Sequence, residues 1–203
     1  MIKSSNPIDR NEGSKEKRER IDGLLANPIA FAYYYYQDYA YAPFSKNHER
    51  TMQEILDNPN NIFLEQMFRG FGKSVVFGLI IPSILKFRGE LNGMMLGSLN
   101  NDLACERLAD IQANLMHNPR IINDFGEQYS YGNWEDGAFK TKDDIGFYAF
   151  GKEQSPRGTR FQWKRPNYGL IDDLNSARQL KNPAIALEDK RWVLDEFKPA
   201  LWT

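Results

Sequence analysis

The chain has 203 residues, 41% of them apolar, and carries 26 Lys and Arg side chains against 27 Asp and Glu. That length predicts one domain with a core large enough to need no disulfide or structural metal. A net charge of -1 excludes a chain that is basic throughout, so a nucleic acid would have to bind a local patch. The single Cys105 excludes an internal disulfide framework and a multi-cysteine zinc site, and it favours a reducing compartment.

Neither a membrane span nor a signal peptide is expected. The longest mostly apolar stretch, Val75–Leu85, has about half of the ~20 residues that a span needs, and it contains Pro82. The N-terminal residues lack the apolar segment of a signal peptide.

The N-terminal part of the chain changes composition abruptly. Residues 1–25 are polar and predict a flexible lead-in, disordered or loosely helical, before a folded domain over 26–203. Phe31–Phe44 then holds eight aromatics in fourteen residues. These rings predict a brace across the outside of the main core or, alternatively, a platform on which bases stack.

Apolar spacing along the rest of the chain predicts alternating helices and strands. Helices are expected over His48–Leu56, Lys73–Phe87 and Ala104–Leu115, the last capped by Asn100 or Asn101, and strands over Ile62–Leu64, Met94–Leu96 and Leu170–Ile171. Glycine-punctuated alternation between Tyr129 and Tyr168 predicts small strands and hairpins. This order is typical of an α/β protein with a mainly parallel sheet flanked by helices, in which ligands bind at the carboxyl ends of strands.

A candidate phosphate site lies between the first expected strand and its helix. Met67–Ser74 reads MFRGFGKS, which fits the pattern GxxxxGK[ST] except at its first glycine. In such a loop, backbone N–H groups and a lysine bind the phosphates, and the hydroxyl binds Mg²⁺. The pattern predicts nucleotide binding, with a structural turn as the alternative, by these residues: Arg69, Gly70, Phe71, Gly72, Lys73 and Ser74.

Two neighbouring carboxylates, Asp172 and Asp173, follow the expected strand Leu170–Ile171. A phosphate-loop ATPase needs one carboxylate for the magnesium shell and a second for the attacking water. Because successive strand residues face opposite sides, we assign Asp172 to the metal and Asp173 to the water.

A basic stretch precedes these carboxylates. Ser155–Pro166 reads SPRGTRFQWKRP, with four basic residues interleaved with Phe161 and Trp163. It predicts a charged hairpin face, a phosphate-sensing arginine or a contact with the DNA backbone.

Four blocks in this order resemble the large terminase subunit of tailed bacteriophages. They are the RGFGKS loop, the pair Asn118–Pro119, the pair Arg157–Gly158 and the segment RPNYGLIDDL at 165–174. The resemblance covers roughly Phe44–Trp192 and implies a RecA-like, additional-strand P-loop fold. It further implies an ATP-hydrolysing motor that moves double-stranded DNA into an empty capsid through the portal.

The resemblance implies a role for each matching residue. Lys73 and Ser74 would bind phosphate and Mg²⁺, and Arg69 would lie near the γ-phosphate of ATP. Asp172 would be the magnesium carboxylate, and Asp173 the catalytic one.

Two further roles are implied upstream of the acidic pair and of the loop. Arg157 would act in trans on a neighbouring subunit's ATP, a role for which Arg160 competes. The segment around Phe44 and His48 stands where the family binds adenine, so Phe44 is a candidate adenine contact.

The same resemblance implies partners and a location. These are double-stranded DNA, the portal protein, the small terminase subunit and a homo-oligomeric ring, a pentamer, on the capsid, with no membrane. The chain would act in the host cell cytoplasm, docked transiently on the procapsid and absent from the mature virion. The family's coupling motif and nuclease carboxylates have no match before Thr203, so we expect a truncated ATPase domain without nuclease activity. The alternatives are a non-catalytic nucleotide- or partner-binding fragment of such a motor and another RecA-like nucleic-acid translocase.

Overall fold

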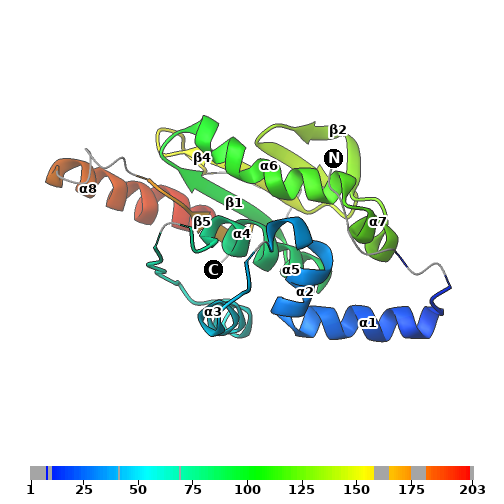
Figure 1. The fold of residues 1–203 in the computed structure, drawn as a ribbon. Coiled ribbons are helices and arrows are strands. Elements are labelled where there is room, and N and C mark those ends of the chain that lie inside the picture. Colours follow the sequence, from blue (N-terminus) through cyan, green and yellow to red (C-terminus); the bar gives the residue numbers. More distant parts are fainter. Residues whose placement is uncertain are drawn as a thin grey trace. The chain divides into compact units, whose positions relative to one another are not determined.

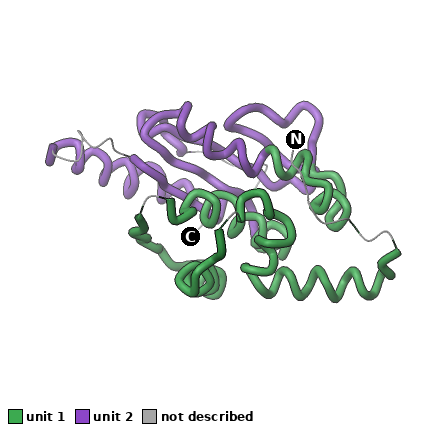
Figure 2. Tube along the Cα trace, in the orientation of Figure 1, with its two compact units in different colours: residues 1–90, 113–128 green, residues 91–112, 129–203 purple. Residues whose placement is uncertain are grey.

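The computed structural model describes residues 8, 11–40, 42–68, 70–157, 165–174 and 182–201. Its contacts divide the chain into two compact units, which Figure 2 colours separately. Unit 1 comprises Met1–Glu90 and Ala113–Gln128, and unit 2 comprises Leu91–Gln112 and Tyr129–Thr203.

Unit 1 is helical in its described residues. Helix α6 (Asn101–His117) begins in unit 2 and ends in unit 1. The other helical elements of unit 1 are α1 (Ser14–Ala26), α2 (Pro28–Tyr35), η1 (Gln37–Tyr39), α3 (Lys46–Asp57), α4 (Lys73–Val75), η2 (Val76–Ile80), α5 (Ile81–Phe87) and α7 (Pro119–Phe125), as Figure 1 shows. The predicted helix over His48–Leu56 is confirmed as α3, and the lead-in is helical from Ser14.

The aromatic run forms part of the core of unit 1. Phe31, Tyr35 and Tyr36 are almost wholly buried, and the Tyr36 hydroxyl donates a hydrogen bond of 2.6 Å to Ser83 Oγ in α5. Packed aromatic rings bury large areas, and a tyrosine hydroxyl can be buried with them where it finds a partner. The rings therefore stabilise unit 1 from within, and the prediction of an outer brace is wrong for these three residues.

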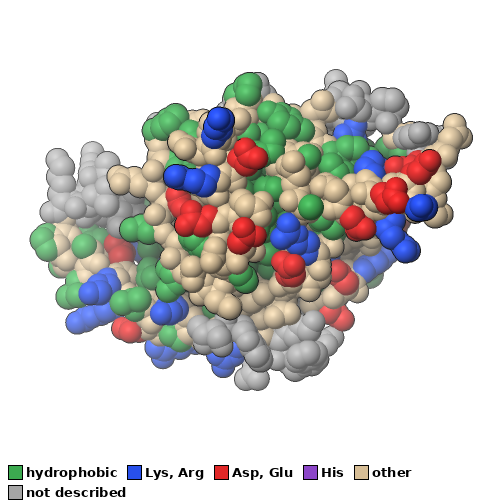
Figure 3. Space-filling model, turned by 90° about the horizontal axis from the view of Figure 1, so that it is seen from below, with side chains coloured by type: hydrophobic (Ala, Val, Ile, Leu, Met, Phe, Trp, Pro, Cys, Tyr) green, Lys and Arg blue, Asp and Glu red, His purple; other side chains and the backbone are tan. Residues whose placement is uncertain are grey.

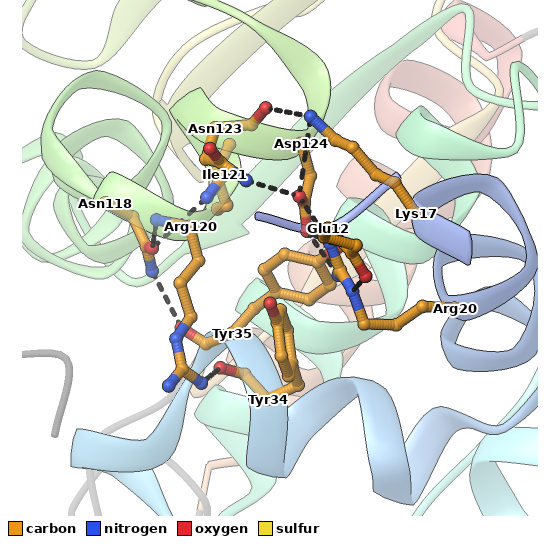
Figure 4. A network of polar contacts seen from close by, with 10 residues as sticks. All are labelled: Glu12, Lys17, Arg20, Tyr34, Tyr35, Asn118, Arg120, Ile121, Asn123 and Asp124. Carbon is orange, nitrogen blue, oxygen red and sulfur yellow. Dashed lines mark hydrogen bonds and ion pairs between the residues drawn. The ribbon is translucent and has the colours of Figure 1, made fainter. Parts of the chain in front are cut away.

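A buried carboxylate, Asp124 of α7, ties α1 and α2 to α7 (Figure 4). Arg20 of α1 contacts it at 2.8 Å and 2.9 Å, and the Tyr35 hydroxyl donates to it at 2.7 Å. Burial raises the pKa of the Asp124 carboxyl, but the hydrogen bonds from Arg20, Tyr35 and Asn123 outweigh it, so this pKa lies below the ordinary value of 3.8.

This lowered pKa predicts an acid-sensitive link in unit 1. The charged carboxylate stabilises the folded state at all pH values above 3.8, and this contribution is lost as the pH falls through the lower, folded pKa of Asp124. We expect Asp124→Asn to lower the free energy of unfolding at pH 7 by about 2 kcal/mol, and to flatten its pH dependence below about pH 4. Urea unfolding at a series of pH values measures both effects, with Asp22→Asn, an exposed aspartate of α1, as the matched control. Parallel pH curves for Asp124→Asn and the unmodified chain would contradict the assignment.

The predicted helix over Lys73–Phe87 is helical throughout, but its hydrogen-bonding pattern changes in the middle. The segment η2 between α4 and α5 is π-helical, with the Ile81 N–H bonded to the carbonyl of Val76. In a regular α-helix the ring of Pro82 would clash with the carbonyl of Gly78, and such wider turns often accommodate a proline. Apart from its first residues this helix is buried, as its apolar sequence predicts.

The predicted strand over Ile62–Leu64 is wrong. Residues 61–68 form no strand, and Ile62, Leu64 and Phe68 are exposed. Apolar residues on both faces are typical of a central parallel strand, but a strand forms only beside a neighbour that supplies its hydrogen bonds. No strand in the described ranges pairs with this segment.

Unit 2 contains a mixed sheet of order β2-β3-β4-β1-β5. Its strands are β1 (Gly93–Ser98), β2 (Tyr129–Glu135), β3 (Ala138–Thr141), β4 (Gly146–Gly151) and β5 (Tyr168–Ile171). β1 runs parallel to β4 and β5, whereas β2, β3 and β4 pair antiparallel. The α/β class is confirmed, and the expected mainly parallel sheet is corrected to a mixed one, because the glycine-rich hairpin after α7 adds two antiparallel strands.

Helices cover the two faces of strand β1. Met95 packs with Trp192, in a C-terminal helical stretch of unit 2 made of α8 (Pro183–Arg191), η4 (Trp192–Phe197) and α9 (Lys198–Ala200). Gly97 lies on the same face, where a Cβ atom would stand 2.8 Å from the Trp192 ring. Ser98 is the next residue along the strand, so its side chain lies on the opposite face, where it contacts Arg107 of α6. The predicted cap of α6 is confirmed as Asn100, whose side chain accepts from the Leu103 N–H at 2.9 Å.

Candidate nucleotide site

The backbone of the glycine turn before α4 is left-handed at two positions. Gly70 and Gly72 adopt left-handed conformations, with φ values of 86° and 78°. Glycine takes such angles without the strain that a Cβ atom causes in most other residues. Gly72 is the N-cap of α4, and its carbonyl accepts the first helical hydrogen bond, from the Val76 N–H at 2.9 Å.

Lys73 and Ser74 occupy the first turn of the helical stretch that follows. Lys73 is half-buried and Ser74 is exposed. Within the described residues, no hydrogen bond or ion pair engages the Lys73 ammonium group. A cation at a helix N-terminus is unfavourable against the helix dipole, so an anion bound there would be stabilised by the lysine and by the positive end of the dipole together. Arg69 lies outside the described residues.

Helix α3 contacts this turn through His48. The His48 Nε2 atom lies 2.7 Å from the Phe71 carbonyl oxygen, and its ring stacks on the Phe71 ring at 3.9 Å between centroids. The ring of Phe44, the candidate adenine contact, meets His48 edge-on at 5.4 Å. The structure thus brings Phe44, His48 and the predicted loop together within unit 1.

The two aspartates follow directly after β5 in unit 2, as predicted. Asp172 N donates to the carbonyl of Gly97 at 2.9 Å, which extends the pairing of β5 with β1. Asp173 has left the strand, with a φ of 51°. Both carboxylates contact the Arg107 guanidinium, Asp172 at 3.5 Å and Asp173 at 2.9 Å. The simple alternation that assigned them to opposite sides therefore does not describe their positions.

Arg107 is a candidate site residue that the sequence patterns missed. Besides the two carboxylates it donates to Ser98 Oγ at 2.6 Å and to the Asp172 carbonyl at 2.5 Å. A signal was present, because Arg107 stands three residues after Ala104 and four before Ile111, within the apolar face of α6. A charged residue on such a face is expected to have a partner, and here the partners lie at the carboxyl ends of β1 and β5.

The arginine proposed to act in trans is held within unit 2. Arg157 contacts Glu196 at 3.0 Å and donates to the Asp195 carbonyl at 2.6 Å, with 59% of its side chain exposed. Its competitor Arg160 lies outside the described residues, as do Phe161, Trp163 and Lys164.

The residues assigned to magnesium have suitable chemistry. A serine hydroxyl and a carboxylate are oxygen ligands, and Mg²⁺ commonly binds through one or two such ligands together with substrate phosphates and water. The Asp172 side chain is 15% exposed, so it retains access to solvent. Among the described residues no group of three or more acidic, histidine or cysteine side chains gathers at one point.

Comparisons of the chain with protein families, with curated proteins and with solved structures found no match. No helix in the described ranges has the length and apolar character to cross a membrane.

Proposed function

We propose that the chain binds ATP at the glycine turn and hydrolyses it with Mg²⁺, as a RecA-like P-loop ATPase. One observation carries the proposal: Lys73 begins a helix directly after left-handed Gly72, in the sequence RGFGKS. The Gly72 and Lys73 amides precede or open that helix, so their N–H groups are the donors a phosphate needs. In this proposal Asp172 holds the magnesium shell, and Asp173 orients the attacking water.

The proposed task is packaging of double-stranded viral DNA, as in the large terminase subunits that the chain resembles. The expected setting is a ring of subunits at a portal, with a small terminase subunit, in the host cell cytoplasm. Figure 3 shows one face on which acidic and basic side chains are interspersed, in keeping with the net charge of -1. Neutralising DNA phosphates needs clustered basic groups, so the proposal assigns DNA contact to a ring that combines several copies rather than to this face alone.

A second candidate is nucleotide binding without hydrolysis. It is favoured by Arg107, which forms ion pairs with both aspartates that the ATPase proposal uses. If that cluster is purely structural, the carboxylates serve to fix β5 against α6 and do not act on water.

Calorimetric titration with MgATP, paired with a phosphate-release assay on the same protein, distinguishes these candidates. We expect micromolar to millimolar binding and measurable release from a P-loop ATPase, with less binding when EDTA removes Mg²⁺. Binding without release supports the second candidate. Absence of binding contradicts both.

A further inference from the structure

The glycine turn contacts the side chain of His48 from α3, and that contact fixes the plane of the peptide between Phe71 and Gly72. His48 is 8% exposed, and its Nε2 atom reaches the Phe71 carbonyl at 2.7 Å, between the two left-handed glycines. The rings of His48 and Phe71 lie nearly parallel, with an interplanar angle of 16°. Both the backbone and the side chain of Phe71 are therefore held by one residue.

The contact of the other ring nitrogen of His48 shows which of the two nitrogens carries the proton. Nδ1 lies 2.9 Å from the Ser45 backbone nitrogen, at the N-cap of α3. Because a backbone N–H can only donate, Nδ1 accepts this bond and the ring proton lies on Nε2. Nε2 then donates to the Phe71 carbonyl, so the cap of α3 orients the ring as a donor toward the turn.

The direction of the Phe71 carbonyl also fixes the direction of the Gly72 N–H, because both belong to one planar peptide. In a trans peptide the carbonyl of one residue and the N–H of the next point in opposite directions in one plane. With the Phe71 carbonyl directed at His48, the Gly72 N–H points away from His48. Gly72 tolerates either sign of φ, so without an anchor this peptide plane can turn over at little cost.

We infer that His48 is a positioning residue that keeps the Gly72 N–H presented for a phosphate. The inference rests on the proposed nucleotide site and assigns His48 no contact with the nucleotide itself. Binding affinity then includes no cost for ordering this peptide plane, which is the benefit of a preformed site.

The His48 ring is itself held by the packing of Phe44 and Tyr33. Phe44 meets the His48 ring edge-on at an interplanar angle of 87°, and Tyr33 of α2 meets Phe44 at 75°. The Phe44 N–H donates to the Tyr33 hydroxyl at 3.2 Å. Part of the aromatic run in and after α2 therefore supports the turn through His48.

Two substitutions separate the hydrogen bond from the ring stack. His48→Phe keeps an aromatic ring but no donor, whereas His48→Gln keeps a donor near the Nε2 position but no ring. We expect His48→Phe to weaken MgATP binding about tenfold, and His48→Gln to weaken it about threefold or less, because the bond to Phe71 decides the peptide orientation. Gln53→Ala, also in α3 but with its side chain bonded to Asp57 and not to the turn, is the matched control.

Hydrogen exchange in the nucleotide-free protein gives a second readout. We expect faster exchange over residues 66–74 in His48→Phe than in His48→Gln, with thermal midpoints close to that of the control. Equal affinity and equal exchange in both variants overturn the inference. A protein that binds no MgATP contradicts the proposed nucleotide site, and the exchange rates then decide alone whether His48 orders the turn.

Discussion

Replacing Lys73 by alanine is expected to reduce ATP affinity about 100-fold or more, because charge-assisted contacts to phosphate are among the strongest single interactions in such a site. Fold stability should change little. Lys73 stands at the first position of its helix, where alanine is compatible and where a cation opposes the helix dipole. Calorimetric titration with MgATP, together with a thermal melt, measures both quantities.

Lys46 provides a matched control for this substitution. It is likewise the first residue of a helix of unit 1, α3, but it follows a serine cap rather than a left-handed glycine. Lys46→Ala should therefore leave ATP affinity within about twofold of the unmodified chain. Equal affinities of Lys73→Ala and Lys46→Ala would exclude the glycine turn as the phosphate site.

Elements defined by local patterns were predictable. The spacing of Ala104, Leu108 and Ile111 indicates a helix from local pattern alone, and Asn100 caps it in the structure as the sequence indicates. The glycine turn was equally predictable, since Gly70 and Gly72 permit the left-handed angles that the structure shows there.

Features that depend on distant partners were not predictable from one sequence. Whether Ile62–Leu64 becomes a strand depends on a neighbour that local pattern does not contain. The contact of His48 with Phe71 joins residues 23 positions apart, and that of Arg107 with Asp173 joins residues 66 apart. Pattern placed His48 on a helix, but only the fold supplies its partner and the partners of Arg107.

Replacing Asp173 by asparagine is expected to slow ATP hydrolysis about 100-fold or more while leaving MgATP affinity within about twofold, because the carboxylate proposed to orient or deprotonate the attacking water is lost. Asparagine has nearly the same shape and readily adopts the left-handed backbone found at this position, where φ is 51°. The backbone of the turn after β5 should therefore persist. Single-turnover phosphate release is measured across protein concentrations, because the proposed ring would bring a neighbouring subunit to each site.

Two companion variants assign the cause of that loss. Asp172→Asn should instead weaken the Mg²⁺-dependent part of ATP binding, since its carboxylate is proposed to hold the magnesium shell. Arg107→Gln removes the ion pair to Asp173 but leaves its carboxylate in place, so hydrolysis should persist at a rate well above that of Asp173→Asn. Equal losses in Arg107→Gln and Asp173→Asn would show that the ion pair, rather than the carboxylate acting on water, sustains turnover. A wild-type rate in Asp173→Asn would place the catalytic carboxylate elsewhere in the chain.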